Sequence, residues 1–333
     1  MKVAVVWNHD HGGVINEFGQ HSPEEYSREA VESVLLALNE GGHDTLLCEG
    51  DKGMLASLEG FMPCDPQARP SGMVFNMAYG IQGECRYTHV PAMLEMAGVP
   101  YTGSSPLGHG IALDKVIAKR LIRDCGVPTP KFRVMRRETE NVGDLRFPLV
   151  VKPRHESTSL GLQLVHDPAQ LRDAVEKVVA QYAQDALVEE YIEGQEIWVG
   201  LLGNGQVEAL PLLEQDFGSR EERMVTWEDK YGLATRKVRM ICPAQVDSKL
   251  ATTLREASVA AFRACLCRDY ARVELRIDNR GQPFVLEINS MATLGMESSY
   301  VRAATMAGYS FSSLINRILD VARARSFGIS PPQ

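Results

Sequence analysis

The chain has 333 residues, of which 44% are hydrophobic and 23% charged, a composition typical of a globular protein with two or three domains. Its formal net charge of −8 argues against a nucleic-acid-binding surface as the main function. No apolar run approaches the length of a membrane span, and the first residues read as a buried strand rather than a signal peptide.

The seven cysteines are odd in number and scattered along the chain. Such usage is typical of reduced thiols, so we expect a cytoplasmic protein. Cys265 and Cys267 lie close together, but no second pair or well-spaced histidine accompanies them. Buried free thiols are therefore favoured there over a metal centre.

The first hundred residues alternate between strand and helix patterns. Apolar runs at 2–7, 44–50 and 71–77 predict strands, and the spacing of apolar residues over 27–42 predicts an amphipathic helix. This order indicates an open, mostly parallel α/β unit, in which ligands gather at the carboxyl ends of the strands. The loop after the first strand holds His9 and His11, which either touch substrate or are solvated; solvated histidines are the more common case.

The middle of the chain predicts a second unit. We expect helices over 113–126 and 168–183 and strands over 147–153, 162–165 and 186–194. Lys152 closes an apolar strand beside a loop rich in small and hydroxyl residues (154–161), which suits a phosphate clamp. Taken singly, Lys115, Lys152 and Lys230 each favour the interpretation as a surface residue, and a shared phosphate site depends on their coming together.

The last third predicts an antiparallel meander (196–243), a helix (247–267), a hairpin (270–278 with 283–289) and a final amphipathic helix (309–327). A register that places 278 near 283 brings Glu274 opposite Glu287, where two carboxylates repel unless a cation lies between them. With the amide oxygen of Asn289 they form a hard oxygen shell that suits Mg²⁺. The alternative is a solvated polar strand face, the more common case for a hairpin considered alone.

Seven motifs together make a more specific signal. In chain order they are LDK (113–115), FPLVVKP (147–153), ESTSLG (156–161), VEEYIEGQE (188–196), DKY (229–231), RVE (272–274) and EIN (287–289). This order resembles the ATP-grasp fold and, within it, the D-alanine–D-alanine ligases, over about residues 25–325. The resemblance implies an α/β protein, α+β in its C-terminal part, with a Rossmann-like N-terminal α/β domain (1–103), a central ATP-grasp subdomain (104–187) and a C-terminal one (188–325).

The resemblance also implies roles for named residues. ATP would contact Lys115, Lys152, Glu189, Glu190, Ile192, Glu196 and Lys230, with Glu190 and Ile192 acting through their backbone near the adenine. Magnesium or manganese would be held by Glu274, Glu287 and Asn289. Catalysis and first-substrate binding would use Arg272, Glu25, Thr158 and Tyr231, and the second substrate would meet Gly295, Ser299 and Tyr300. Glu25 is equally readable as an acid favoured at a helix N-terminus.

The implied activity is ATP-dependent ligation: an amino-acid carboxylate becomes an acyl phosphate and then an amide, with release of ADP and phosphate. Partners would be small amino acids or amines, with no nucleic acid or membrane, and the resemblance implies a homodimer. Three departures concern substrate: the long His-rich first loop, Tyr79 where the ligases have histidine, and a longer loop after Asn289 without their proline. They favour a biosynthetic dipeptide or amide ligase over a cell-wall D-alanine–D-alanine ligase; a kinase-like enzyme and an ATP-binding sensor are further alternatives.

Overall fold

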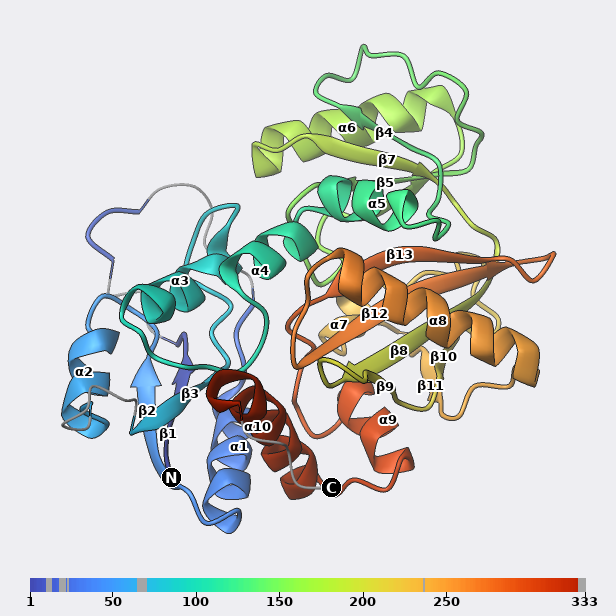
Figure 1. Ribbon diagram of the computed structural model, residues 1–333. Coiled ribbons are helices and arrows are strands. Elements are labelled where there is room, and N and C mark those ends of the chain that lie inside the picture. The colour runs from blue at the N-terminus through green and yellow to red at the C-terminus, as the bar shows by residue number, and fades with distance from the viewer. Residues whose placement is uncertain (10–13, 18–21, 23, 65–70, 236, 329–333) are drawn as a thin grey trace.

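The structure is a computed structural model that describes residues 1–9, 14–17, 22, 24–64, 71–235 and 237–328. Three sheets carry the fold (Figure 1). The first is parallel, in the order β2-β1-β3, as the alternation of strands and helices predicts. Its strands are β1 (Lys2–Trp7), β2 (Asp44–Glu49) and β3 (Gly72–Asn76), with helices α1 (Arg28–Glu40), α2 (Met54–Phe61), η1 (Arg86–Thr88) and α3 (His89–Met96) around them.

The second sheet is antiparallel, in the order β4-β7-β5-β6. It consists of β4 (Phe132–Met135), β5 (Leu149–Pro153), β6 (Gln163–Val165) and β7 (Ala186–Glu190), with α6 (Pro168–Tyr182) packed on one face. Two helices lead into it, α4 (Pro106–Leu113) and α5 (Lys115–Asp124), where the sequence predicts only one. Asp114 separates them because its side chain caps α5 by accepting from the backbone N–H groups of Val116 and Ile117.

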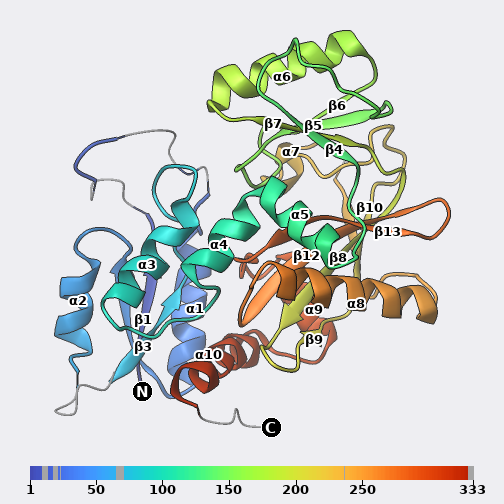
Figure 2. The same ribbon diagram turned by 45° about the horizontal axis from the view of Figure 1, so that its top comes forward.

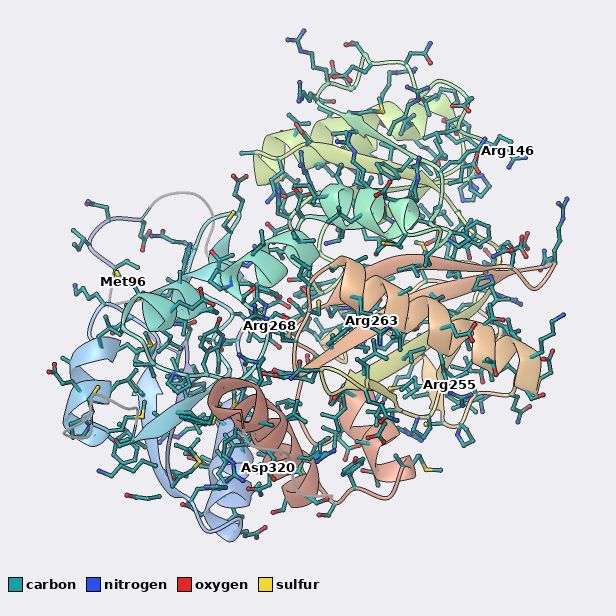
Figure 3. The ribbon with its side chains drawn as sticks, viewed as in Figure 1. Met96, Arg146, Arg255, Arg263, Arg268 and Asp320 are labelled. Atoms are coloured by element: carbon teal, nitrogen blue, oxygen red, sulfur yellow. The ribbon has the colours of Figure 1, made fainter. Side chains whose placement is uncertain are left out.

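The third sheet has six strands, in the order β11-β10-β8-β12-β13 with β9 paired to β8. They are β8 (Gly194–Leu202), β9 (Glu208–Ala209), β10 (Leu213–Asp216), β11 (Arg239–Ile241), β12 (Tyr270–Asp278) and β13 (Pro283–Asn289). A short helix, α7 (Trp227–Lys230), interrupts the predicted meander. The sheet's outer face is covered by α8 (Ser248–Ala264), whose exposed side bears Arg255 and Arg263 (Figure 3).

The last two helices, α9 (Ser299–Met306) and α10 (Phe311–Phe327), return the chain to the first domain. The red α10 lies beside the blue α1 in Figure 1, and one apolar cluster contains residues of both. Asn316 of α10 donates a hydrogen bond of 2.8 Å from Nδ2 to the carbonyl of Ala37 in α1. The turned view in Figure 2 shows the second sheet and α6 standing over the third sheet, with the first domain to one side.

A β-bulge decides which side chains of β13 face inward. Glu274 pairs with Glu287 as predicted, but the register then shifts, so that Ile277 rather than Asp278 lies opposite Pro283. Strict alternation would put Val285 on the same face as Glu287. The extra residue lets Val285 and Ile288 both enter the apolar cluster under α8, while Leu286 and Glu287 face the opposite side.

All seven cysteines are free thiols, and Cys265 and Cys267 are buried. Among the described residues no group of three or more His, Cys, Asp or Glu side chains is arranged to hold a metal ion. None of the helices in the described part of the chain has both the length and the apolar character needed to cross a bilayer.

Candidate active site

A narrow cleft separates the second and third sheets. One wall comes from β5, β7 and the loop after β5, and the other from β8, β12 and β13. The lining includes most of the residues that the resemblance assigns to ATP, which are Lys115, Lys152, Glu189, Glu190, Ile192 and Glu196, together with two of its metal candidates, Glu274 and Glu287. Strand alternation explains this gathering, because Val151 and Val188 fill the core behind their sheet while Lys152 and Glu189 face the cleft.

Glu189 lies between two lysines at the base of this cleft. Its carboxylate is 2.6 Å from Lys152 Nζ and 2.8 Å from Lys119 Nζ, and all three side chains are buried. Burial lowers the pKa of Lys119 to about 8, against the attraction of Glu189. Burial alone would raise the pKa of Glu189, but the two lysines lower it overall. Sequence reasoning missed Lys119, although its position four residues after Lys115 on an amphipathic helix places both on one face.

Glu196 is a buried carboxyl at the far end of the cleft. It accepts a hydrogen bond of 3.0 Å from Trp198 Nε1 and lies 3.6 Å from Arg276 Nε. Burial raises its pKa to about 7, although Arg276 opposes the shift. The carboxylate of the neighbouring Glu190 instead pairs with Arg146 at 3.3 Å, and Arg146 lies at the surface of the molecule (Figure 3).

The opposed carboxylates Glu274 and Glu287 face the cleft from β12 and β13. Asn289 donates to Glu274 Oε1 at 3.0 Å, and Glu274 also pairs with Arg272. Glu287 lies 3.9 Å from Lys115 Nζ. Burial would raise the pKa of Glu287, but Lys115 and the other surrounding cations lower it, so the carboxylate is held ionised.

The loop after β5 has an unusual backbone. Thr158 and Ser159 have φ values of 52° and 58°, in the left-handed region that a β-branched residue rarely adopts. The surrounding contacts must stabilise this conformation, and such strain is concentrated at functional sites. Lys115 Nζ donates to the carbonyl of Glu156 in the same loop.

A second, larger cavity of about 860 Å³ opens beside the cleft. Its lining combines residues of α1, of the loop after β5 and of the third sheet. Its lining includes the following predicted residues: Glu25, Thr158, Lys230, Tyr231, Arg272, Asn289, Gly295 and Ser299. Arg272 lies over the Trp198 ring at 4.4 Å, and its Nη1 is 3.4 Å from Ser299 Oγ. Trp198 was missed, although its alternation with Glu196 on one strand would have placed it on the same face.

The helix α7 presents Lys230 and Tyr231 to this cavity. Lys230 Nζ lies 5.8 Å from the centre of the Trp198 ring, and the ring of Tyr231 packs on Trp227 at 4.7 Å. Tyr231 is 45% exposed. A capping box between Thr226 and Asp229 fixes the start of this single turn.

Two adjacent carboxylates face the cavity just before α1. Glu25 is exposed, whereas Glu24 is committed to protein partners: it accepts from the Tyr87 hydroxyl and lies 3.7 Å from Arg86 Nη2. Sequence reasoning missed Glu24 and Arg86, and no periodicity in the segment around Arg86 could have revealed a buried arginine. Tyr79, at the position of the expected family histidine, stacks on Tyr26 at 5.0 Å and forms part of the wall.

Tyr300 does not line the large cavity, unlike Gly295 and Ser299. Its side chain is fully buried, and its hydroxyl donates to the carbonyl of Leu201 at 3.0 Å. The ring packs over Gly200, where an added Cβ would lie 3.1 Å from it. Of these two residues only Ser299, the first residue of α9, has its place in the cavity lining. Of the two loop histidines, His9 stacks on Trp7 and does not line the cavity, and His11 lies outside the described residues.

Comparisons with known proteins show the family to which the chain belongs. The family model described as "D-ala D-ala ligase C-terminus" matches residues 121–320. A protein of Sinorhizobium fredii described as uncharacterized is 64% identical over 332 residues, or 98% of each chain. The D-alanine–D-alanine ligase of Syntrophobacter fumaroxidans is 36% identical over 238 residues, which are 70% of this chain and 75% of that protein.

Among solved structures, the D-alanine–D-alanine ligase from Bacillus anthracis complexed with ATP superposes with a TM-score of 0.75 at 21% identity, covering 98% of both chains. At that identity the likeness shows the fold, and it confirms the ATP-grasp architecture expected from the motifs. The family follows from the family model and the sequence relatives: the chain belongs to the D-alanine–D-alanine ligases, which are ATP-dependent, ADP-forming ligases that make carbon–nitrogen bonds.

Proposed function

We propose that this ligase activates the carboxylate of an amino acid with Mg·ATP and joins it to a second amine. One observation carries the proposal: the predicted metal set lies where the two cavities meet. Glu274 and Glu287 line the narrow cleft, and Asn289 lines the large cavity. A phosphate held at this set from the cleft would therefore face a substrate in the cavity.

The donor set fits a hard divalent cation. Two carboxylates and one amide offer only oxygen ligands, which Mg²⁺ prefers, and Mn²⁺ accepts the same set. When bound, the ion would neutralise charge on the transferring phosphoryl group. In the structure, Arg272 pairs with Glu274 and Lys115 lies near Glu287. These two cations offset the repulsion between the opposed carboxylates.

ATP would lie in the cleft. Lys115, Lys152 and Lys230 would contact its phosphates, with Lys152 exchanging part of its contact with Glu189 for a phosphate oxygen. Glu189 and the backbone of Glu190 and Ile192 would meet the adenine. Glu196 would accept hydrogen bonds from the ribose hydroxyls.

The chemistry balances in two steps. A carboxylate oxygen of the first amino acid attacks the γ-phosphorus, and the bond to ADP breaks. The amine of the second substrate then attacks the acyl carbon and loses a proton, and phosphate leaves with its oxygen. Arg272, desolvated over Trp198, would stabilise the oxygen that becomes negative in between.

Substrate binding would use the large cavity. We assign the first amino acid's ammonium group to Glu25, because Glu24 is already paired with Arg86 and Tyr87. Thr158 and Tyr231 would close over this substrate. Gly295 and Ser299 would receive the second substrate, with Arg272 near its carboxylate.

Three wider assignments belong to the same proposal. We place the boundary between the central and C-terminal subdomains after Glu190, because the expected boundary at 187/188 would cut β7. The free thiols support a cytoplasmic location. A homodimer is proposed from the family resemblance. The net charge of −8 supports small molecules rather than nucleic acids as partners.

The test is ADP release with Mg·ATP over D- and L-amino acids, singly and in pairs, with mass spectrometry of the products. ADP release that needs two substrates and yields an amide supports the proposal and names the pair. Arg272→Met should lower kcat by roughly 10²- to 10³-fold. The matched control is Arg255→Met on the exposed face of α8, which should leave kcat unchanged.

The other outcomes are distinct. Formation of D-alanyl-D-alanine as the only product would indicate a cell-wall type ligase. It would contradict the interpretation that the longer loop after Asn289 changes the choice of second substrate. ADP release with one substrate and no amide would indicate a kinase-like enzyme. ATP binding without turnover for any pair would contradict ligation and favour a sensor.

A further inference from the structure

Arg86 is a buried cation that the proposed chemistry does not use. It opens η1 between β3 and α3, is only 2% exposed and lines neither the cleft nor the large cavity. Burying a guanidinium is costly unless its N–H groups are paired. Its partners therefore indicate what the residue is for.

Those partners come from two different domains. Arg86 Nη2 lies 3.3 Å from both Glu156 Oε2 and Ser157 Oγ, and Nη1 donates to the carbonyl of His155 at 3.3 Å. On its other side, Nη2 lies 3.7 Å from Glu24 Oε2. One side chain thus joins the segment before α1 to the strained loop that continues into Thr158.

Each end of this connection is itself fixed. Tyr87 binds Glu24 through its hydroxyl, and Gln184 Nε2 donates to Glu156 Oε1 at 2.7 Å. The backbone of Arg86 packs directly on Gly80, where an added Cβ would lie 2.1 Å from the Arg86 carbonyl oxygen. The guanidinium therefore sets the spacing between two braced elements.

We propose that Arg86 is a positioning residue that holds the loop at 155–158 at a fixed distance from the Glu24–Glu25 wall. In terms of the proposed function, on which this inference rests, it keeps Thr158 and Glu25 on opposite sides of one first substrate. Its charge also offsets the repulsion between the buried carboxylate of Glu156 and the half-buried carboxylate of Glu24.

The fork geometry of arginine is essential to this role. A guanidinium presents several N–H groups in a fixed plane, so it contacts the loop and Glu24 together, whereas an ammonium group is a single point. Arg86→Lys should therefore keep the buried charge and the fold while losing one side of the connection. Arg86→Met removes both.

The experiment combines kinetics with hydrogen exchange. Arg86→Lys should lower kcat/KM for the first amino acid roughly 10- to 100-fold, mainly through KM, as expected when a charge-assisted contact to the site is lost. The equilibrium affinity for Mg·ATP should change less than about threefold, because the nucleotide contacts in the cleft remain. Arg86→Met should show a larger loss of the same kind, and the exposed Arg120→Met on α5 should behave as wild type.

Amide exchange of the substrate-free proteins gives a readout that needs no activity. The backbone at 155–160 should exchange faster in Arg86→Lys than in wild type, and α6 should exchange equally in both. Equal loop exchange together with unchanged kcat/KM would overturn the proposal. An equal loss of first-substrate and ATP binding would also overturn it, since that pattern is general structural damage. Failure of the wild type to form any amide would contradict the proposed function alone, and the exchange result would still decide the role of Arg86.

Discussion

Glu196 is a carboxyl group whose surroundings change its protonation. Its pKa is raised from 4.5 to about 7 because burial disfavours the carboxylate, and Arg276 and Trp198 only partly offset this. The folded state thus holds the proton more tightly than the unfolded state. Stability is therefore lost as pH rises from about 4.5 to 7, and the loss is complete above that range.

Replacing Glu196 with glutamine tests this directly. The difference in unfolding free energy between Glu196→Gln and wild type should increase with pH by roughly 3 kcal/mol, since one pKa unit corresponds to about 1.4 kcal/mol. Urea denaturation at pH 5, 6, 7 and 8, without ATP or metal, measures it. The control Glu176→Gln, on the exposed side of α6, should give a difference that does not vary with pH. A flat difference for Glu196→Gln would mean that burial does not hold the proton.

Single residues were predictable where a motif or a strand period fixed their direction. Glu274, Arg272 and Lys152 face the site because alternate residues of their strands enter the core. The sequence left Ser299 and Tyr300 open as alternatives, because loop length alone does not decide which of them lines the cavity. Arg86 had no local signal, since its burial depends on Glu24 and Glu156, which lie 62 and 70 residues away.

At the scale of elements, hydrophobic period and caps predicted most of the strands but only five of the ten α-helices in the described part of the chain, namely α1, α5, α6, α8 and α10. The bulge in β13 was not predictable, because alternation reads the same with or without one extra residue. The helix α7 was missed for a different reason. It spans four residues and none of them is buried, so it leaves no apolar period in the sequence.

The stability of α7 rests on its cap, and this gives a second prediction. The Thr226 side chain accepts from the Asp229 N–H, Asp229 accepts from the Thr226 N–H at 2.9 Å, and Arg220 pairs with Asp229. Thr226→Ala should cost about 1 kcal/mol of local helix stability. Because Lys230 is the last residue of α7 and Tyr231 is its C-cap, KM for ATP and for the first substrate should rise several-fold, while the midpoint of thermal unfolding stays constant.

The matched control is the cap of α8. Asp247 caps that helix by accepting from the Leu250 N–H at 2.9 Å, but α8 lies behind the sheet, away from both cavities. Asp247→Ala should therefore lower the unfolding midpoint and leave KM unchanged, the reverse of Thr226→Ala. Steady-state kinetics and a thermal melt on both variants separate the cases. An unchanged KM in Thr226→Ala would show that the stability of α7 does not affect the binding of ATP or of the first substrate.

At the scale of the whole molecule, the order of the three units was readable from the motifs, but their mutual placement was not. Asp269 is the residue on which that placement converges: it is fully buried with a φ of 64°. Its carboxylate accepts from the Gly103 N–H at 2.8 Å, from Asn204 Nδ2 at 2.8 Å and from Arg325 Nη2 at 2.9 Å. These donors belong to the end of the first domain, the β8–β9 turn and α10.

Arg325 supplies the only charge among these three donors, so its removal tests how strongly the units are joined. Arg325→Met should cost roughly 2–3 kcal/mol, because it leaves the buried Asp269 side chain with only two neutral donors, Gly103 N–H and Asn204 Nδ2. Arg323→Met is the control on the same helix; its pair with Asp320 is partly exposed at 3.5 Å and should cost less than about 1 kcal/mol. Urea denaturation measures both, and a double-mutant cycle with Asp269→Asn isolates the pair. A coupling energy near zero would mean that the ion pair does not help to hold the first domain against the ATP-grasp units. The apolar packing of α10 on α1 would then be the contact that fixes their relative position, and with it the width of the large cavity.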